Sequence, residues 1–372
     1  MNVPKIRYDN FTKEWEKVKL SSQASFLQGL TYTPNDVSND GTIVLRSSNI
    51  QNSMVDYNDI VRVNIIIPEK LKIKENDILM CVRNGSKSLV GKTAWLSKNE
   101  EKCTWGAFMN IIRPKERNKF VYYYLNSKYF YNHVWKDLGT ATVNQITKQT
   151  LESCYLNIPS IEEQKKISNT LSLLDQKIKL QSKKIEDLKL FKKGLLQKQY
   201  NYIKDKNLVE LSYIANIYQP QTISQNKLDN GKYFVFGANG IIGKYSRYNH
   251  KQKQITISCR GENSGKVNIT PEKCWITGNS MVLNTDNNYN VDKIYLKCVL
   301  DSQNLRYLIS GSGQPQITRN VILKHKIPLL PILEQKKFRN PFIKLDLKIH
   351  LEETKVNKLL DIKKGLMQDM FV

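Results

Sequence analysis

Two short polar segments of this 372-residue chain have side chains that could contact nucleic acid. The first runs from Arg83 to Lys87 and the second from Arg260 to Ser264. Arginine, asparagine and serine hydrogen-bond the edges of bases, whereas lysine and arginine hold phosphate groups. We therefore expect each segment to be a turn that touches nucleic acid. A solvated turn without a ligand has the same composition, so that alternative stays open.

Further polar residues follow apolar runs that are typical of strands. One such group follows residues 42–45, and another follows residues 233–243. The predicted DNA contacts are Arg46, Ser47, Ser48, Asn49, Arg83, Asn84, Ser86 and Lys87 in the first half of the chain, and Lys244, Tyr245, Arg247, Arg260, Asn263, Ser264 and Gln314 in the second.

The net charge favours the same kind of partner. The chain has 58 Lys and Arg against 34 Asp and Glu, a formal charge of +24, and nucleic acid is the commonest polyanionic partner. An AT-rich genome also raises the lysine content, so charge alone does not decide the function. No run approaches the roughly 18 apolar residues of a membrane span and no signal-peptide core opens the chain. We expect a cytoplasmic protein.

Catalytic and metal sites are not predicted. The segment 85–93 resembles a phosphate-binding loop but has one residue too many between its glycines, and the segment 261–267 has one too few. Both are expected to be hairpin turns. The six cysteines and four histidines are scattered, so we predict no zinc site. Residues 340–343, Asn-Pro-Phe-Ile, resemble an amino-methyltransferase motif without its second proline, and Phe342 is better explained as core, with Pro341 kinking a helix.

A long repeated stretch organises the chain. The sequence Glu-Gln-Lys-Lys occurs at 163–166 and again at 334–337, and the offset of 171 is kept up to Gly194 and Gly365. Apolar residues recur by threes, fours and sevens, which is the pattern of a coiled-coil helix. The predicted coiled-coil seam is Ile167, Leu171, Leu174, Ile178, Ile185, Leu188 and Leu195 in the first copy, and Phe338, Phe342, Leu345, Ile349, Val356, Leu359 and Leu366 in the second.

The segments between these helices read as mixed domains. Residues 15–20, 42–46, 60–67 and 76–83 favour strands, residues 120–135 have helical spacing, and residues 205–326 repeat this plan. The connectivity requires the two helices to run antiparallel. We predict an α+β fold of two pseudo-repeated globular domains joined by two long antiparallel coiled-coil helices. The predicted segments are a first domain at 1–157, a first helix at 158–205, a second domain at 206–328 and a second helix at 329–372.

Over essentially its whole length the chain resembles the specificity (S) subunits of type I restriction-modification systems. The resemblance rests on residues 4–8 and 11–15, on the Ile-Pro entries with Glu-Gln-Lys-Lys at 158–166 and 327–337, on residues 233–244, and on the Lys-Lys-Gly-Leu helix ends. The chain departs from regular repetition at Pro331, four residues before Gln335, where Pro159 stands five before Gln164.

The resemblance implies two target recognition domains, each reading one half of a split, asymmetric DNA sequence through the major groove. The paired helices would be a spacer that docks two modification subunits, which use S-adenosylmethionine to methylate adenine. Two restriction subunits would add ATP- and magnesium-dependent translocation and cleavage. The chain itself would hold no cofactor and catalyse nothing. The alternatives are a coiled-coil adaptor without DNA affinity and a fused or stand-alone methyltransferase.

Overall fold

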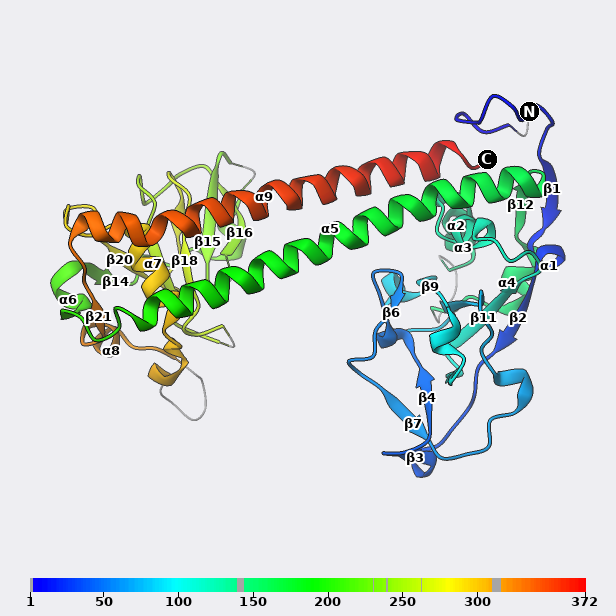
Figure 1. Cartoon of the computed structure of the whole chain (residues 1–372), viewed down its shortest axis with the longest axis horizontal. Helices are drawn as coiled ribbons and strands as arrows, with labels where there is room; N and C mark the ends of the chain where they lie inside the picture. Colours follow the sequence, from blue (N-terminus) through cyan, green and yellow to red (C-terminus); the bar gives the residue numbers. More distant parts are fainter. Residues whose placement is uncertain (1–2, 139–143, 230, 239, 262, 310–315) are drawn as a thin grey trace. The chain divides into compact units, whose positions relative to one another are not determined.

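The computed structural model describes residues 3–138, 144–229, 231–238, 240–261, 263–309 and 316–372. The chain forms two compact units, which we call unit 1 (residues 1–181 and 355–372) and unit 2 (residues 182–354). Two long helices, α5 (Ile161–Asn201) and α9 (Ile332–Asp369), each contribute one end to either unit (Figure 1). Each unit is described by itself below.

Among its described residues unit 1 contains four small sheets, of which the smallest pairs β5 (Ile50–Gln51) with β6 (Met54–Val55). The strands of the first, in the spatial order β2-β11-β8-β9, are antiparallel: β2 (Ala24–Gln28), β11 (Met109–Pro114), β8 (Ile78–Cys81) and β9 (Thr93–Trp95). The second has the order β10-β4-β7-β3, with β10 (Cys103–Trp105) parallel to β4 (Thr42–Leu45) and with β7 (Val61–Val63) and β3 (Val37–Ser38) antiparallel to their neighbours. In the third, β1 (Glu16–Lys19) pairs with β12 (Tyr155–Ile158).

Unit 2 repeats this plan with shorter connections. Its antiparallel sheet has the order β14-β20-β17-β18: β14 (Asn216–Tyr218), β20 (Ser280–Asn284), β17 (Ile255–Ser258) and β18 (Val267–Ile269). Its second sheet, β16-β15-β19, keeps the parallel pair, here β15 (Tyr233–Gly237) with β19 (Trp275–Ile276), and β16 (Gly240–Tyr245) is antiparallel to β15. The third pairs β13 (Leu208–Glu210) with β21 (Lys326–Pro328).

Two predicted elements are shorter than the sequence pattern indicated. The run 60–67 yields a strand only at Val61–Val63, and Ile66 beyond it is 95% exposed. The helical stretch 120–135 divides into α2 (Phe120–Leu125) and α3 (Lys128–Leu138). Asn126 ends α2 because its side-chain amide donates to the Tyr122 carbonyl and to Thr93 of β9. Local pairing partners, which periodicity does not reveal, therefore set these boundaries.

The ends of the long helices are parts of the domain cores. In unit 1 Leu171 of α5 and Phe371, which follows α9, pack in one cluster with Trp15 and Phe120, and the Phe120 and Phe371 rings lie 5.2 Å apart. In unit 2 Phe342 of α9 joins the corresponding cluster. Burial of such side chains stabilises each by roughly 1.5–3 kcal/mol, so each helix end is fastened by its unit's apolar core.

Within each unit α5 and α9 run antiparallel. In unit 1 Lys363 Nζ lies 2.6 Å from Asp175, and in unit 2 Lys184 Nζ lies 2.8 Å from Glu352. As the residue numbers increase along α5, the numbers of the paired residues on α9 therefore decrease. All fourteen positions of the predicted seam are buried or half-buried. The helix α9 is continuous through Pro341, although proline has no N–H to donate to the carbonyl four residues earlier.

Candidate nucleic-acid interface

The turn between β8 and β9 of unit 1, here called the Arg83 turn (residues 83–90), is held by a fixed hydrogen-bond frame. The Cys81 N–H donates to the Lys92 carbonyl at 2.9 Å, and the Gly91 N–H donates to the Cys81 carbonyl at 2.8 Å. Gly91 has a φ of +88°, and a Cβ there would lie 3.1 Å from the Tyr131 ring of α3. Glycine is required because other residues rarely adopt this conformation. The turn is a hairpin, as predicted, and not a strand-to-helix phosphate loop.

Unit 2 has the same frame around the Arg260 turn (residues 260–264, of which 262 is not described). The Ser258 N–H donates to the Lys266 carbonyl at 2.9 Å, and the Gly265 N–H donates to the Ser258 carbonyl at 2.8 Å. Gly265 has a φ of +89°, and a Cβ there would lie 3.2 Å from the backbone of Leu305. The two turns are therefore built alike on sequences that share few residues.

The two arginines occupy matching places in these frames. Arg83 forms an isolated β-bridge with Gln145, and Arg260 forms one with Gln316. Next to each bridge a backbone amide donates to the carbonyl of the residue directly before the arginine, Ile146 to Val82 and Ile317 to Cys259. Both arginines are exposed. Each turn thus presents a cation from a position fixed by backbone hydrogen bonds, which is the arrangement that a base or phosphate contact requires.

Aromatic side chains lie under the cations of the Arg83 turn. The Arg83 guanidinium lies over the Phe108 ring at 5.2 Å, and the Lys87 ammonium lies over the Trp135 ring at 4.6 Å. Phe108 is 57% exposed. Such cation–π contacts orient a charged side chain while its remaining donors stay accessible. Phe108 and Trp135 are not among the contacts predicted from the sequence, because their distance along the chain gives no sign that they meet the turn.

The polar strip Arg46–Asn49 lies beside the Arg83 turn, since the Asn84 side-chain amide donates to Ser47 Oγ at 3.0 Å. The side chains of two of its members already bond to other groups of this chain. Asn49 is fully buried, accepts from the Arg46 N–H, and donates to the carbonyls of Asp56 and Asp59. The Arg46 guanidinium lies 2.9 Å from the Asp59 carboxylate. In this conformation Ser48 and the exposed part of the Arg83 turn, which includes Ser86, are the accessible polar groups of this surface.

The predicted contacts of unit 2 lie on two elements. On strand β16 and just after it, Lys244 Nζ lies over the Phe234 ring at 5.7 Å, Tyr245 meets Trp275 edge to face, and Arg247 is exposed. On the Arg260 turn, Asn263 is exposed and Ser264 is buried, with its Oγ donating to the Gly261 carbonyl at 2.8 Å. Gln314 lies outside the described residues.

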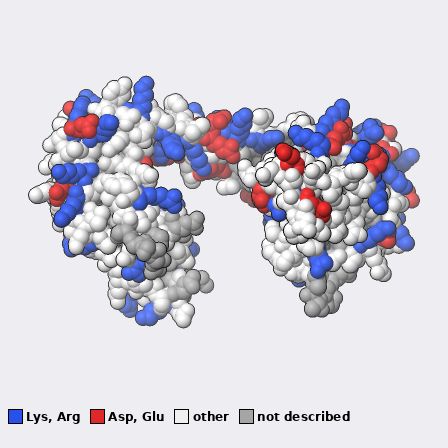
Figure 2. Space-filling view, turned by 90° about the horizontal axis from the view of Figure 1, so that it is seen from below, with Lys and Arg blue, Asp and Glu red and all other residues white. Residues whose placement is uncertain are grey.

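A cavity of about 630 Å³ opens beside the Arg260 turn. It is lined by Asn263 of the turn, by Lys266 just after the turn, by Lys193 of α5 and by Arg306, together with residues 300–305. Three cationic side chains and one carboxylate, Asp301, border this space among the described residues. The excess of cations fits a phosphate group. In Figure 2 Lys and Arg side chains are spread over the visible face of each unit, whereas Asp and Glu side chains gather in fewer places.

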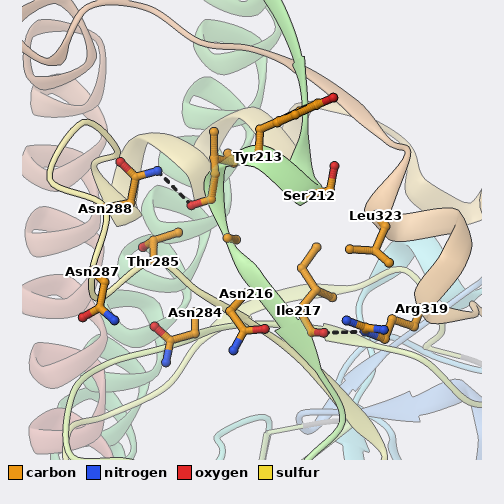
Figure 3. A pocket seen from close by; sticks show the side chains of 12 residues that line it. Ser212, Tyr213, Asn216, Ile217, Asn284, Thr285, Asn287, Asn288, Arg319 and Leu323 are labelled. Atoms are coloured by element: carbon orange, nitrogen blue, oxygen red, sulfur yellow. Dashed lines mark hydrogen bonds between the residues drawn. The ribbon is translucent and has the colours of Figure 1, made fainter.

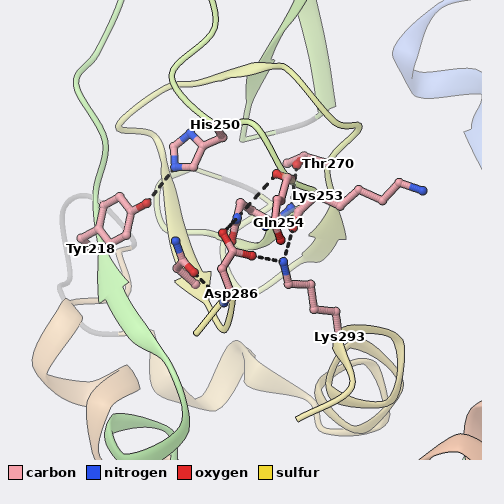
Figure 4. Close-up of polar contacts among 9 residues, drawn as sticks. Tyr218, His250, Lys253, Gln254, Thr270, Asp286 and Lys293 are labelled. Carbon is pink, nitrogen blue, oxygen red and sulfur yellow. Dashed lines mark hydrogen bonds and ion pairs between the residues drawn. The ribbon is translucent and has the colours of Figure 1, made fainter. Parts of the chain in front are cut away.

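Other polar clusters of unit 2 have a structural role. Tyr218 Oη and His250 Nε2 lie 2.8 Å apart, and Asp286 accepts from Gln254 at 2.7 Å and pairs with Lys293 (Figure 4). Burial lowers the pKa of His250, so this imidazole is neutral at physiological pH. These contacts fasten the loop before β17 to β14, to the segment after β20 and to α7 (Lys293–Ser302).

A second, amide-rich cavity of about 470 Å³ lies around α6 (Leu211–Ile214) and β14 (Figure 3). The Asn288 amide donates to the Ile214 carbonyl, and Arg319 donates to the Ile217 carbonyl at 2.6 Å. It shares no lining residue with the Arg260 turn.

The cysteines are not placed as nucleophiles. All six are buried, and burial raises the pKa of the Cys81 thiol to about 11. A thiol in such surroundings remains protonated and inert at neutral pH. No helix of the described residues is long and apolar enough to cross a membrane.

The duplicated frame, with an exposed arginine in each copy, defines a class of proteins built from two repeated domains of mixed helices and strands. Comparison with known protein families shows which family of that class the chain belongs to. The model for the type I restriction modification DNA specificity domain matches residues 12–190 and again residues 203–361. The chain belongs to this family, and it carries two copies of the domain. Its place is therefore among the specificity subunits, which are not the catalytic subunits of these systems.

Individual relatives agree with this assignment. The chain is 27% identical to a Methanocaldococcus jannaschii protein that bears the name "Putative type I restriction enzyme MjaX specificity subunit", over 98% of this chain and 95% of that protein. It is 28% identical to the type I restriction enzyme StySPI specificity subunit of Salmonella potsdam, over 49% of this chain. The matched segment spans 42% of that relative's length, less than half.

Solved structures show the same fold. The type I restriction-modification S subunit of M. genitalium aligns with a TM-score of 0.61 over 100% of this chain and 99% of that one, at 18% identity. The prediction of a specificity-subunit fold with two repeated domains and long helices is confirmed. At this identity the likeness concerns the fold alone.

Proposed function

We propose that this chain is a sequence-specific DNA-binding subunit that reads a bipartite, asymmetric target. The carrying observation is the hydrogen-bond frame that occurs once in each unit and presents Arg83 in one and Arg260 in the other. The residues around these arginines differ between the units. Two similar frames with different exposed side chains would read two different half-sites.

The proposal assigns recognition to residues 1–157 and 206–328, and spacing to residues 158–205 and 329–372. The helix α5 has 41 residues and α9 has 38, and their ends are built into the unit cores. We propose that these helices set the gap between the half-sites. Insertion of one helical turn after Leu188 and another after Leu359 is expected to lengthen the spacer of the recognised sequence. Selected or methylated sequences with an unchanged spacer would refute the role of the helices in spacing.

The outer faces of the helices support docking of two identical partners. Leu180 in unit 1 and Leu351 in unit 2 are both exposed and lie 171 residues apart, and so do Phe191 in unit 2 and Ile362 in unit 1. Single exposed apolar residues are common on protein surfaces, so the support for a protein contact is their recurrence at the same offset in both helices. We propose that each unit docks one adenine methyltransferase subunit there. Two restriction and translocase subunits would complete the complex, and S-adenosylmethionine, ATP and magnesium would bind to these partners and not to this chain.

Mapping of methylated adenines in the native genome before and after deletion of this gene tests the proposal. The expected result is the loss of one methylated sequence with two separated half-sites; an unchanged methylation pattern contradicts it. The subunit would act in the cytoplasm, where the chromosome lies. Binding of the purified chain to duplex DNA should weaken steeply with added salt, since phosphate contacts release counterions. An adaptor without DNA affinity would show no such binding, and a stand-alone methyltransferase would bind S-adenosylmethionine as an isolated chain.

A further inference from the structure

The hairpin β15–β16 of unit 2 exposes two neighbouring isoleucines. Ile241 is 55% and Ile242 is 44% exposed. Their strand β16 lies at the edge of the sheet β16-β15-β19. The register shifts between Val235 and Phe236 of β15, so β16 has one residue more than its partner there. This bulge brings both isoleucines to the surface of one short segment.

The bulge is accommodated by a glycine. A Cβ at Gly237 would lie 3.0 Å from Ile242 Cγ2, so a larger residue would displace the isoleucine. Ile242 therefore lies against the Gly237 backbone through its Cγ2 and Cδ1 methyl groups, while 44% of the residue stays exposed. The exposed apolar pair thus has a defined position on a strand and does not belong to a freely moving loop.

The hairpin that carries the isoleucines is hydrogen-bonded to the strand that leads into the Arg260 turn. Ser258 Oγ donates to the carbonyl of Ala238, which lies between β15 and β16. Ser258 is the last residue of β17, two residues before Arg260. The hydrogen bond thus joins the end of the hairpin to the start of the turn. A ligand that contacts Arg260 can therefore also reach the end of the hairpin near Ala238.

The surroundings of the isoleucines are cationic. Lys244 follows on the same strand with its ammonium over the Phe234 ring, Arg247 is exposed two residues after the strand, and Arg260 is exposed on the neighbouring turn. An apolar pair framed by cations complements a polyanion that also has methyl groups. Duplex DNA meets this description, because the C5 methyl group of thymine projects into the major groove between the phosphate backbones.

Unit 1 differs at the matching place. The parallel pair β4–β10 corresponds to β15–β19. The segment after β4 is the polar strip Arg46–Asn49, whereas Ile241 is the fourth residue after β15. The two units therefore present different chemistry beside the same arginine frame. Polar groups suit the hydrogen-bonding edges of bases, and aliphatic groups suit a methyl group.

We propose that Ile241 and Ile242 contact thymine methyl groups, and that the half-site read by unit 2 contains thymine at these positions. This inference rests on the proposed function, since it requires that unit 2 lies in the major groove of DNA. Thymine at these positions would be a part of the target sequence that the residues in the first half of the chain do not determine.

The test removes only the methyl group. The tagged full-length chain is isolated from its native cells with the subunits that accompany it, and its preferred duplex is selected from a randomised pool. Each thymine of that duplex is then replaced by deoxyuridine. Loss of one buried methyl group is expected to weaken binding about fourfold, and only in the half-site whose selectivity Arg260→Ala relaxes.

Protein variants assign the effect to the isoleucines. The double variant Ile241→Asn with Ile242→Asn is expected to bind thymine and deoxyuridine duplexes equally and to keep its preference in the other half-site, which also shows that it is folded. Ile241→Val should retain discrimination. Ile66→Asn, at the exposed isoleucine of unit 1, is the matched control and should change nothing in the unit 2 half-site.

The outcomes separate the two proposals. Selection of a bipartite sequence without any deoxyuridine effect overturns the role of the isoleucines and leaves the proposed function standing. A deoxyuridine effect that persists in the double variant also overturns it. Failure to select any sequence overturns sequence-specific recognition, and the inference fails with it.

Discussion

Replacement of Arg83 by alanine is the sharpest test of the duplicated frame. The Arg83 side chain is exposed and its guanidinium lies over Phe108, so its removal takes away at most an exposed cation–π contact of about 0.5–1 kcal/mol. The free energy of unfolding should therefore change little. A bidentate contact between arginine and a base edge is worth about 1–3 kcal/mol, which corresponds to a roughly 5- to 150-fold loss of affinity.

The loss should concern one half-site only. Arg260→Ala is the matched variant, because Arg260 holds the same place in the frame of unit 2. Competition binding at one fixed salt concentration, with duplexes in which either half-site is scrambled, measures each contribution separately. Arg83→Lys keeps the charge without the planar fork, and we expect it to retain the salt dependence but to lose base selectivity.

Two results would refute this reasoning. If Arg83→Ala and Arg260→Ala weaken the same half-site, the two units do not divide the target. If neither variant changes half-site selectivity while both bind DNA less tightly, the arginines contact phosphates alone. Thermal unfolding of both variants within a few degrees of the unchanged protein serves as the folding control.

Three further predictions concern the framework. Gly265→Ala should destabilise unit 2 by about 1–3 kcal/mol and impair one half-site, because its φ is +89° and a Cβ would press on the Leu305 backbone; an unchanged unfolding midpoint in urea would contradict this. Gly194→Ala and Gly365→Ala should each raise the free energy of unfolding by roughly 0.5–1 kcal/mol, since both glycines lie inside helices with no neighbour within 4 Å of a new Cβ; a loss of stability would show an unrecognised contact. Burial lowers the pKa of His325, whose Nε2 lies 2.8 Å from Gln303 Oε1. The unfolded chain thus binds the proton first, and stability that is present above pH about 6.5 is lost as the pH falls towards the lower folded pKa. His325→Gln should therefore lose less stability than the unchanged protein between pH 7.5 and 5.5 in chemical unfolding; an equal loss would refute the role of His325.

Several features of this protein follow from the sequence alone. The constant offset of 171 residues and the apolar periodicity in both copies predict two long helices with matching seams, and the fourteen seam residues are buried or half-buried in the structure. Such a pattern is readable because a helix has one period, and that period decides which residues share a face. The Asn-Gly and Gly-rich segments likewise predicted hairpin turns, since few residues other than glycine adopt a positive φ.

The tertiary structure alone decided how the turns are built and what surrounds them. Phe108 and Trp135 lie beneath Arg83 and Lys87, and the Asn49 side chain forms hydrogen bonds with the backbone. The hairpin that carries Ile241 is joined to the strand before Arg260 by the hydrogen bond from Ser258 to Ala238. None of these contacts has a sequence signal, because each joins residues that are distant along the chain or depends on a bulge. The periodicity of apolar residues indicates the secondary structure that a single segment forms. A recognition surface is made by segments that meet only when the sheets have formed, so its composition emerges from packing and not from local pattern.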